Sequence, residues 1–202
     1  MYHTHTRLFF VTAVAALVAA AFVPARPAHG AVGRENFLSD GEQQFVNQAW
    51  GLSSAQISLG GDVEHQAANS DVKAFGERMV AYHTVFNGQL KVLADQYRGS
   101  VPDQLDAGGQ RALDRLSGLK GAEFDREYMR AAIDALTQSV ALFERQSKDV
   151  AETPLDNWAG GVVPELRREL QVAERIGRDL GMPSSPDDGA IAASHQEPAK
   201  GR

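Results

Sequence analysis

The spacing of apolar residues most constrains this chain, because they recur at every third or fourth position across residues 39–181. That spacing places them on one face of an α-helix, whereas a half-buried strand needs a period of two, which no run in the chain shows. The pattern is clearest in the helix expected over residues 70–98, at Val72, Phe75, Met79, His83, Phe86, Leu90, Leu93 and Tyr97. We therefore predict an all-α protein.

Capping signals divide this region into four helices. The first is expected over residues 39–68, opened by a Ser-Asp-Gly-Glu capping box and with a potential kink near Gly51. The third is expected over residues 122–150. The fourth follows Thr-Pro at its start and ends at Gly-Met-Pro, which gives residues 153–181. Each helix has one apolar stripe, so the four helices must pack on each other as a four-helix bundle.

The connections select the topology of this bundle. Only two or three residues join the first helix to the second and the third to the fourth, so each pair is expected to be antiparallel. Residues 99–121 form a much longer connection with a short helix expected at 105–116. A connection of this length can cross a helix of roughly 40 Å, at about 3.3 Å per extended residue. This favours the ferritin-like up-down-down-up arrangement, although a simple up-down bundle with an elaborated loop remains an alternative.

The chain begins with features of a secretory signal peptide, predicted over residues 1–30. Residues 8–23 are uncharged and are followed at once by Pro24, so they fall short of the roughly 20 residues that a transmembrane anchor needs. We expect an exported protein of the periplasm or cell envelope, with secretion as an alternative. The bundle domain is predicted over residues 31–181, without a transmembrane segment, and a disordered tail over residues 182–202, which lack apolar periodicity.

Charge and cysteine content exclude several functions. Removal of residues 1–30, which carry two arginines and no acid, changes the net charge from −6 to −8. An acidic domain is unsuited to binding nucleic acid, because proteins bind nucleic acid largely by neutralising its phosphates with basic side chains. No cysteine occurs, so disulfides, thiolate metal sites and cysteine nucleophiles are unavailable.

The strongest candidate for a functional residue is His83, which lies on the apolar stripe of the second helix. Gln56 on the first helix and Glu169 on the fourth are placed to meet it at mid-height. These three could form a polar core cluster, a metal or small-ligand site, or an acid-base pair. His65 points away from its stripe and should face solvent. The chain has no Glu-x-x-His motif, no phosphate loop and no dinucleotide fingerprint.

Several segments resemble a bacterial family, that of domain of unknown function 4142, in order and spacing. They are Asp71-Val72-Lys73-Ala74-Phe75, Arg78-Met79-Val80 with His83, Leu116-Ser117-Gly118, Phe124-Asp125-Arg126 with Tyr128-Met129, Ala141-Leu142-Phe143-Glu144 and Pro164-Glu165-Leu166. The resemblance covers about residues 40–180 and implies an exported ferritin-like bundle. The function of the family is not established.

The resemblance also implies that a metal site, if the family has one, is altered in this chain. Where the family commonly carries an acid this chain has Gln56, and where further histidines are common it has Leu136 and Glu169. His83 alone matches the family's histidines at these positions.

We therefore expect a non-catalytic structural or binding module with no cofactor. The alternative is a ferritin-like protein that binds a small ligand or a transition metal such as iron, manganese or zinc at a reduced site of His83, Glu169 and Gln56. The identity of a protein partner or small ligand is left open.

Overall fold

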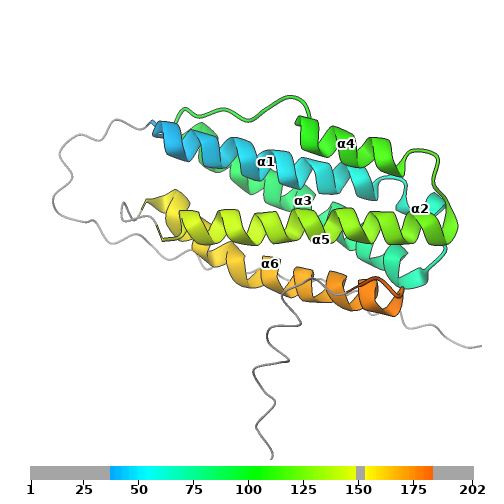
Figure 1. Ribbon diagram of the computed structural model, residues 1–202. Coiled ribbons are helices and arrows are strands. Elements are labelled where there is room, and N and C mark those ends of the chain that lie inside the picture. Colours follow the sequence, from blue (N-terminus) through cyan, green and yellow to red (C-terminus); the bar gives the residue numbers. More distant parts are fainter. Residues whose placement is uncertain (1–36, 149–152, 184–202) are drawn as a thin grey trace, which may run out of the picture. The chain divides into compact units, whose positions relative to one another are not determined.

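The computed structural model describes residues 37–148 and 153–183, and these form helices without any strand (Figure 1). The helices are α1 (Asp40–Gly60), α2 (Val63–Gln66), α3 (Ser70–Gln96), α4 (Ala107–Leu116), α5 (Gly121–Gln146) and α6 (Pro154–Asp179). Four of them are long and form the bundle, while α2 and α4 belong to the connections. The prediction of an all-α four-helix bundle is confirmed.

The order of directions is up-down-down-up, because α3 and α5 begin at the same end of the bundle. There the carboxylate of Asp125, near the start of α5, accepts hydrogen bonds from the backbone N–H groups of Ala68 at 3.1 Å and Asn69 at 3.0 Å. The start of α1 instead meets the end of α5, where the rings of Phe45 and Phe143 lie 4.9 Å apart. The connection before α5 therefore returns along the bundle and carries α4 (Figure 1), as the predicted ferritin-like crossover requires.

The capping signals place the helix starts correctly. Ser39 and Glu42 form the reciprocal capping box of α1, and Thr153 and Asp156 form that of α6. These bonds satisfy N–H groups that have no partner within the helix. The predicted end of the third helix at position 150 lies outside the described residues, in which α5 ends at Gln146.

The first predicted helix breaks after Gly60, and α1 continues as a helix through Gly51. A Cβ at Gly60 would lie 2.5 Å from Val80 Cγ2, and one at Gly76 would lie 2.6 Å from Val63 Cγ1. The chain turns here because two glycines let α1 and α2 approach α3 closely. Val63 at the start of α2 is 1% exposed as a result.

The core has an aromatic cluster near the start of α1, to which each long helix contributes one ring. Its members are Phe45, Phe86, Phe143 and Trp158, with ring centroids 4.9–5.7 Å apart. Leu136 of α5 is fully buried, so it is part of the packed core. The polar residues Ser53, Gln56 and His83 are also buried, among these apolar side chains.

Two predicted segments lie largely or wholly outside the described residues, namely the signal peptide at 1–30 and the tail at 182–202. Met182, assigned to the tail, packs against the core, and its backbone N–H donates to the Gly177 carbonyl at 2.9 Å. None of the described helices is long and apolar enough to cross a membrane.

Candidate functional site

His83 lies in the middle of α3 with its imidazole inside the bundle, where the residue is 2% exposed. The rings of Tyr82 and Phe86 lie beside it, with centroids at 5.0 and 5.9 Å. Burial in these surroundings penalises the charged imidazolium and lowers the pKa of His83 to about 4. The imidazole is therefore neutral at physiological pH.

Ser53 of α1 is the hydrogen-bond partner of this imidazole. Its Oγ lies 3.0 Å from His83 Nδ1 and 3.4 Å from the His83 carbonyl oxygen. The other ring nitrogen, Nε2, is buried and has no partner within the described part of the chain. A neutral histidine carries one proton on its two nitrogens. The Ser53 hydroxyl has one proton. If it donates to Nδ1, the ring proton is on Nε2; if it donates to the His83 carbonyl oxygen, Nδ1–H donates to Oγ and Nε2 is an unprotonated acceptor.

Gln56 lies one turn after Ser53 on the same face of α1 and is 1% exposed. Its amide nitrogen donates to the Ala132 carbonyl of α5 at 3.3 Å, while Oε1 is buried and has no partner among the described residues. This oxygen is an acceptor, so it is complementary to His83 Nε2 only when the ring proton is on Nε2.

Glu169 of α6 has a different partner. Its Oε2 accepts from Arg78 of α3, at 3.3 Å from Nε and 3.2 Å from Nη2. Burial, followed by the charge of Glu169, raises the pKa of the neighbouring Tyr82 to about 12. The Glu169 carboxylate is therefore ion-paired with Arg78 at the α3–α6 seam.

Among the described residues, no hydrogen bond joins any two of His83, Gln56 and Glu169, and no group of three or more histidines and carboxylates could hold a metal ion. Of the three predicted residues, His83 and Gln56 are both buried, and Ser53, which lies on the same face of α1 as Gln56, bonds to His83. Glu169 is instead bonded to Arg78. His65 is exposed on α2, as expected.

Sequence reasoning missed Ser53 and Asp125. The buried face of α1 passes through Ala49, Ser53 and Gln56, whereas the more apolar Leu52 is only partly buried. Steps of four and three between these positions were the available signal, but serine is a weak indicator of burial. Asp125 resembled an ordinary acid in a first helical turn, and its bonds to a distant segment leave no local pattern.

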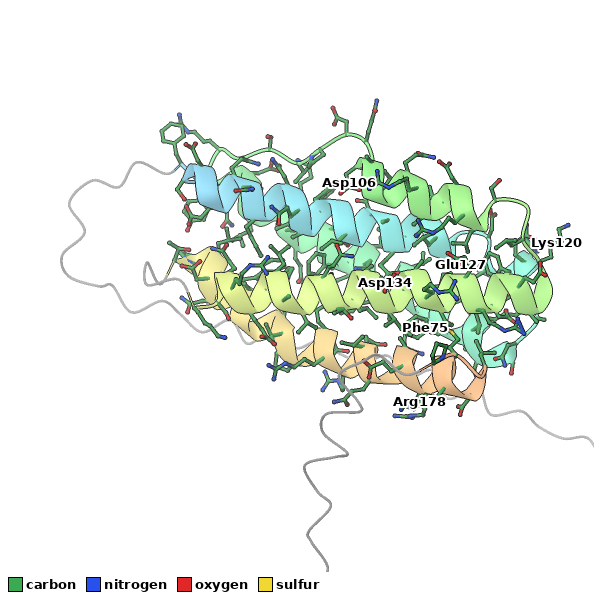
Figure 2. The ribbon with its side chains drawn as sticks, viewed as in Figure 1. Phe75, Asp106, Lys120, Glu127, Asp134 and Arg178 are labelled. Atoms are coloured by element: carbon green, nitrogen blue, oxygen red, sulfur yellow. The ribbon has the colours of Figure 1, made fainter. Side chains whose placement is uncertain are left out.

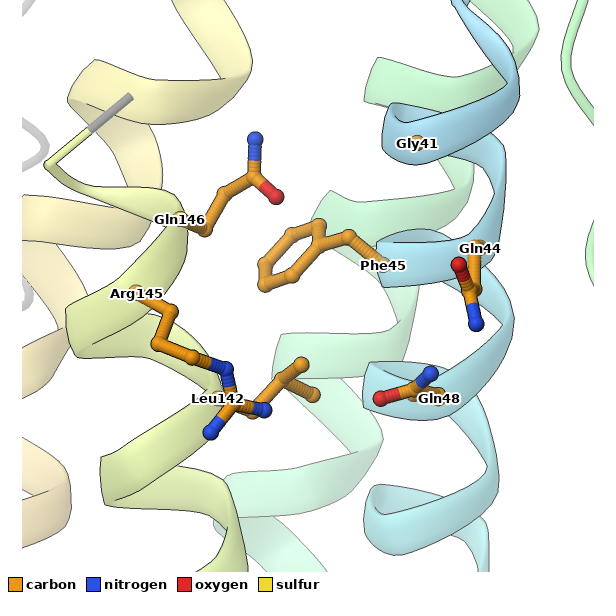
Figure 3. Close-up of a pocket in the computed structure, with 7 residues that line it drawn as sticks. All are labelled: Gly41, Gln44, Phe45, Gln48, Leu142, Arg145 and Gln146. Carbon is orange, nitrogen blue, oxygen red and sulfur yellow. The ribbon is translucent and has the colours of Figure 1, made fainter.

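A separate groove of about 410 Å³ lies on the surface between the start of α1 and the end of α5. Figure 3 shows Phe45 and Leu142 between the two helices, with the polar ends of Gln48, Arg145 and Gln146 around them. The Gln146 amide donates to Asp156 at 2.6 Å. This groove can offer amide and guanidinium hydrogen bonds over a small apolar floor.

These features define a class of protein, the four-helix bundles with a long crossover and a histidine buried at mid-height. Within it the chain belongs to the family of domain of unknown function 4142 (DUF4142), whose model matches residues 28–176. The resemblance deduced from the sequence is confirmed.

No curated protein matches the chain in sequence. A solved structure of a DUF305 protein from Streptomyces coelicolor, described as secreted, is similar with a TM-score of 0.60 and 11% identity. The match covers 72% of this chain and 96% of that chain. At this identity the likeness shows the fold alone.

Proposed function

We propose that the mature protein is an exported helical bundle of the periplasm or cell envelope that acts as a non-catalytic structural or binding module. Export is supported by the uncharged segment at residues 8–23 and by the description of the structural relative as secreted. The proposed cleavage site after Gly30 precedes the described helices.

The observation that carries this proposal is that buried polar groups join helices to one another. His83 and Ser53 connect α3 with α1, Gln56 connects α1 with the α5 backbone, and Glu169 accepts from α3. General acid-base catalysis needs a group that reaches the substrate and titrates near the working pH. The His83 imidazole is buried and its pKa is lowered to about 4, which suits a fixed core residue better than a catalyst.

A second function, the binding of a small ligand or metal at His83, is favoured by one specific observation. His83 Nε2 and Gln56 Oε1 are both buried and lack partners among residues 37–148 and 153–183, and such atoms are costly in a protein interior. A neutral imidazole is a common ligand of iron, manganese or zinc, and Ser53 at Nδ1 would orient the ring. Against this, Glu169 is engaged by Arg78, and the family resemblance implies that Leu136 stands where a further histidine is common.

Elemental analysis separates these two functions. The protein would be purified from its native compartment without a metal-affinity tag, together with the variants His83→Ala and His65→Ala. We expect no stoichiometric transition metal in any of them. A metal that is lost in His83→Ala but kept in the exposed control His65→Ala would overturn the proposal.

The exported location is tested independently by cell fractionation and by sequencing the amino terminus of the purified protein. We expect the protein in the periplasmic or envelope fraction, beginning at Ala31. An intact amino terminus in the cytoplasmic fraction would contradict export.

A further inference from the structure

A second pocket, of about 270 Å³, lies where the crossover helix α4 covers the seam between α1 and α5. Its walls come from all three helices, and small residues make up much of its floor. These include Gly51 and Ala55 of α1, Ala112 of α4, and Ala131 and Ala135 of α5. The small side chains leave room for an occupant between the helices.

Asp106 holds the start of α4 over this pocket. Its Oδ1 accepts from the Gly109 backbone N–H at 2.7 Å, which caps the helix. Its other oxygen, Oδ2, would lie 3.3 Å from a Cβ at Gly51, which also lines the pocket. The close approach of α4 to α1 thus leaves a carboxylate oxygen beside the pocket wall.

Charges of both signs line the same pocket without neutralising each other. Asp134 of α5 and Arg111 of α4 have no ion pair within the described part of the chain, although both line it. Arg115, also in the lining, is held at 2.9 Å from the Glu127 carboxylate outside it. Figure 2 shows Asp106 on the α4 side of this region and Asp134 on α5.

We propose that this pocket binds a small zwitterion, a molecule that carries one ammonium and one carboxylate on a short aliphatic body. Asp134 receives the ammonium group, and Asp106 also lines the pocket. The Arg111 guanidinium receives the carboxylate, for which its planar fork of donors is suited. The alanine-rich floor contacts the aliphatic part.

The size and composition of the pocket support this class of ligand. Drug-sized ligands occupy pockets of about 300–1,000 Å³, so a pocket of 270 Å³ suits a smaller molecule. Asp106, Arg111 and Asp134 line the pocket, are exposed, and have no ion pair among the described residues; a singly charged ligand can pair with only one sign of charge here, whereas a zwitterion can pair with both. This site does not involve His83, so it stands or falls independently of the metal test.

The test is isothermal titration calorimetry of the mature protein at low salt with glycine, β-alanine and 4-aminobutyrate. Their charges are separated by increasing lengths, so the tightest binder reports the spacing of the site. Acetate and ethylamine serve as singly charged probes. We expect at least one zwitterion to bind measurably at about 10 mM, and at least about tenfold more tightly than either singly charged probe.

Variants assign the binding to the pocket. Asp134→Asn and Arg111→Gln should each weaken the best zwitterion at least about tenfold, because each removes one charged partner. Gly51→Ala should also weaken it by placing a methyl group in the pocket wall. Asp103→Asn and Arg126→Gln, which change exposed residues outside the lining, should bind as the unmodified protein does.

Circular dichroism of each variant ensures that only folded proteins are compared. The proposal is overturned if no zwitterion of the series binds, if acetate or ethylamine binds as tightly, or if folded Asp134→Asn and Arg111→Gln keep full affinity.

Discussion

Acidification should destabilise this protein through His83. The imidazole is neutral in the folded state because burial lowers its pKa from 6.5 to about 4. In the unfolded chain the same side chain is solvated and takes up a proton below about pH 6.5. The unfolded state therefore binds more protons between these two values, and the free energy of unfolding must fall as the pH falls through this window.

The size of the effect follows from the difference between the two pKa values. A difference of about 2.5 units corresponds to roughly 3 kcal/mol, at about 1.4 kcal/mol per unit. About 2 kcal/mol of this should be lost between about pH 7.5 and pH 5. For a chain of this size, that corresponds to a decrease in melting temperature of roughly 4–8 °C.

The assay is urea unfolding followed by circular dichroism at about pH 7.5, 6.5, 5.5 and 5. Unmodified protein is compared with His83→Gln and with His65→Gln, which removes an exposed histidine from α2. Carboxylates titrate in all three proteins, so their contribution cancels in the differences. We expect His83→Gln to lose about 2 kcal/mol less than the unmodified protein across this range, and His65→Gln to behave normally. Equal pH dependence in the unmodified protein and His83→Gln would refute the assignment.

Three further predictions concern the packing of the bundle, and each is measured by urea unfolding. Leu136→Ala should lower the free energy of unfolding by about 2–5 kcal/mol through lost burial and a cavity. Leu136→His should also destabilise the protein, and added zinc should not restore its stability. A large zinc-dependent gain in the stability of Leu136→His would instead show that the ligand geometry is usable. Gly76→Ala should destabilise because its Cβ would lie 2.6 Å from Val63 Cγ1. Gly88 lies on the same helix, but a Cβ there would meet no described atom within 4 Å, so Gly88→Ala should stabilise by up to about 1 kcal/mol. Equal effects of the two substitutions would contradict the close packing at Gly76. Asp125→Ala should cost at least about 1 kcal/mol because two backbone N–H groups lose their acceptor, and an unchanged stability would show that these bonds contribute nothing.

The fold was predictable from the sequence because its determinants are local and repeated. Apolar spacing gave the four long helices, capping residues gave their starts, and the long connection before α5 selected the crossover. The break after Gly60 was not predictable in the same way. Gly51 and Gly60 look alike in sequence, and only the packing of Val63 on Gly76 across two helices distinguishes them.

The candidate site was predictable in part. Periodicity placed His83 and Gln56 inside the bundle, and both are buried. Hydrogen-bond partners depend on how far each helix is rotated about its axis and shifted along it. The apolar periodicity does not determine either quantity to within one residue. Ser53 therefore replaced the expected partners of His83, and Arg78 engaged Glu169 at the edge of the core.

The buried hydrogen bonds have a role that apolar stripes cannot supply. Leucine, alanine and phenylalanine tolerate sliding by a turn, because one apolar contact replaces another at similar energy, whereas a displaced polar group loses its partner in a water-free interior. The bond of Ser53 with His83 fixes the register of α1 against α3, and that of Gln56 with Ala132 fixes α1 against α5.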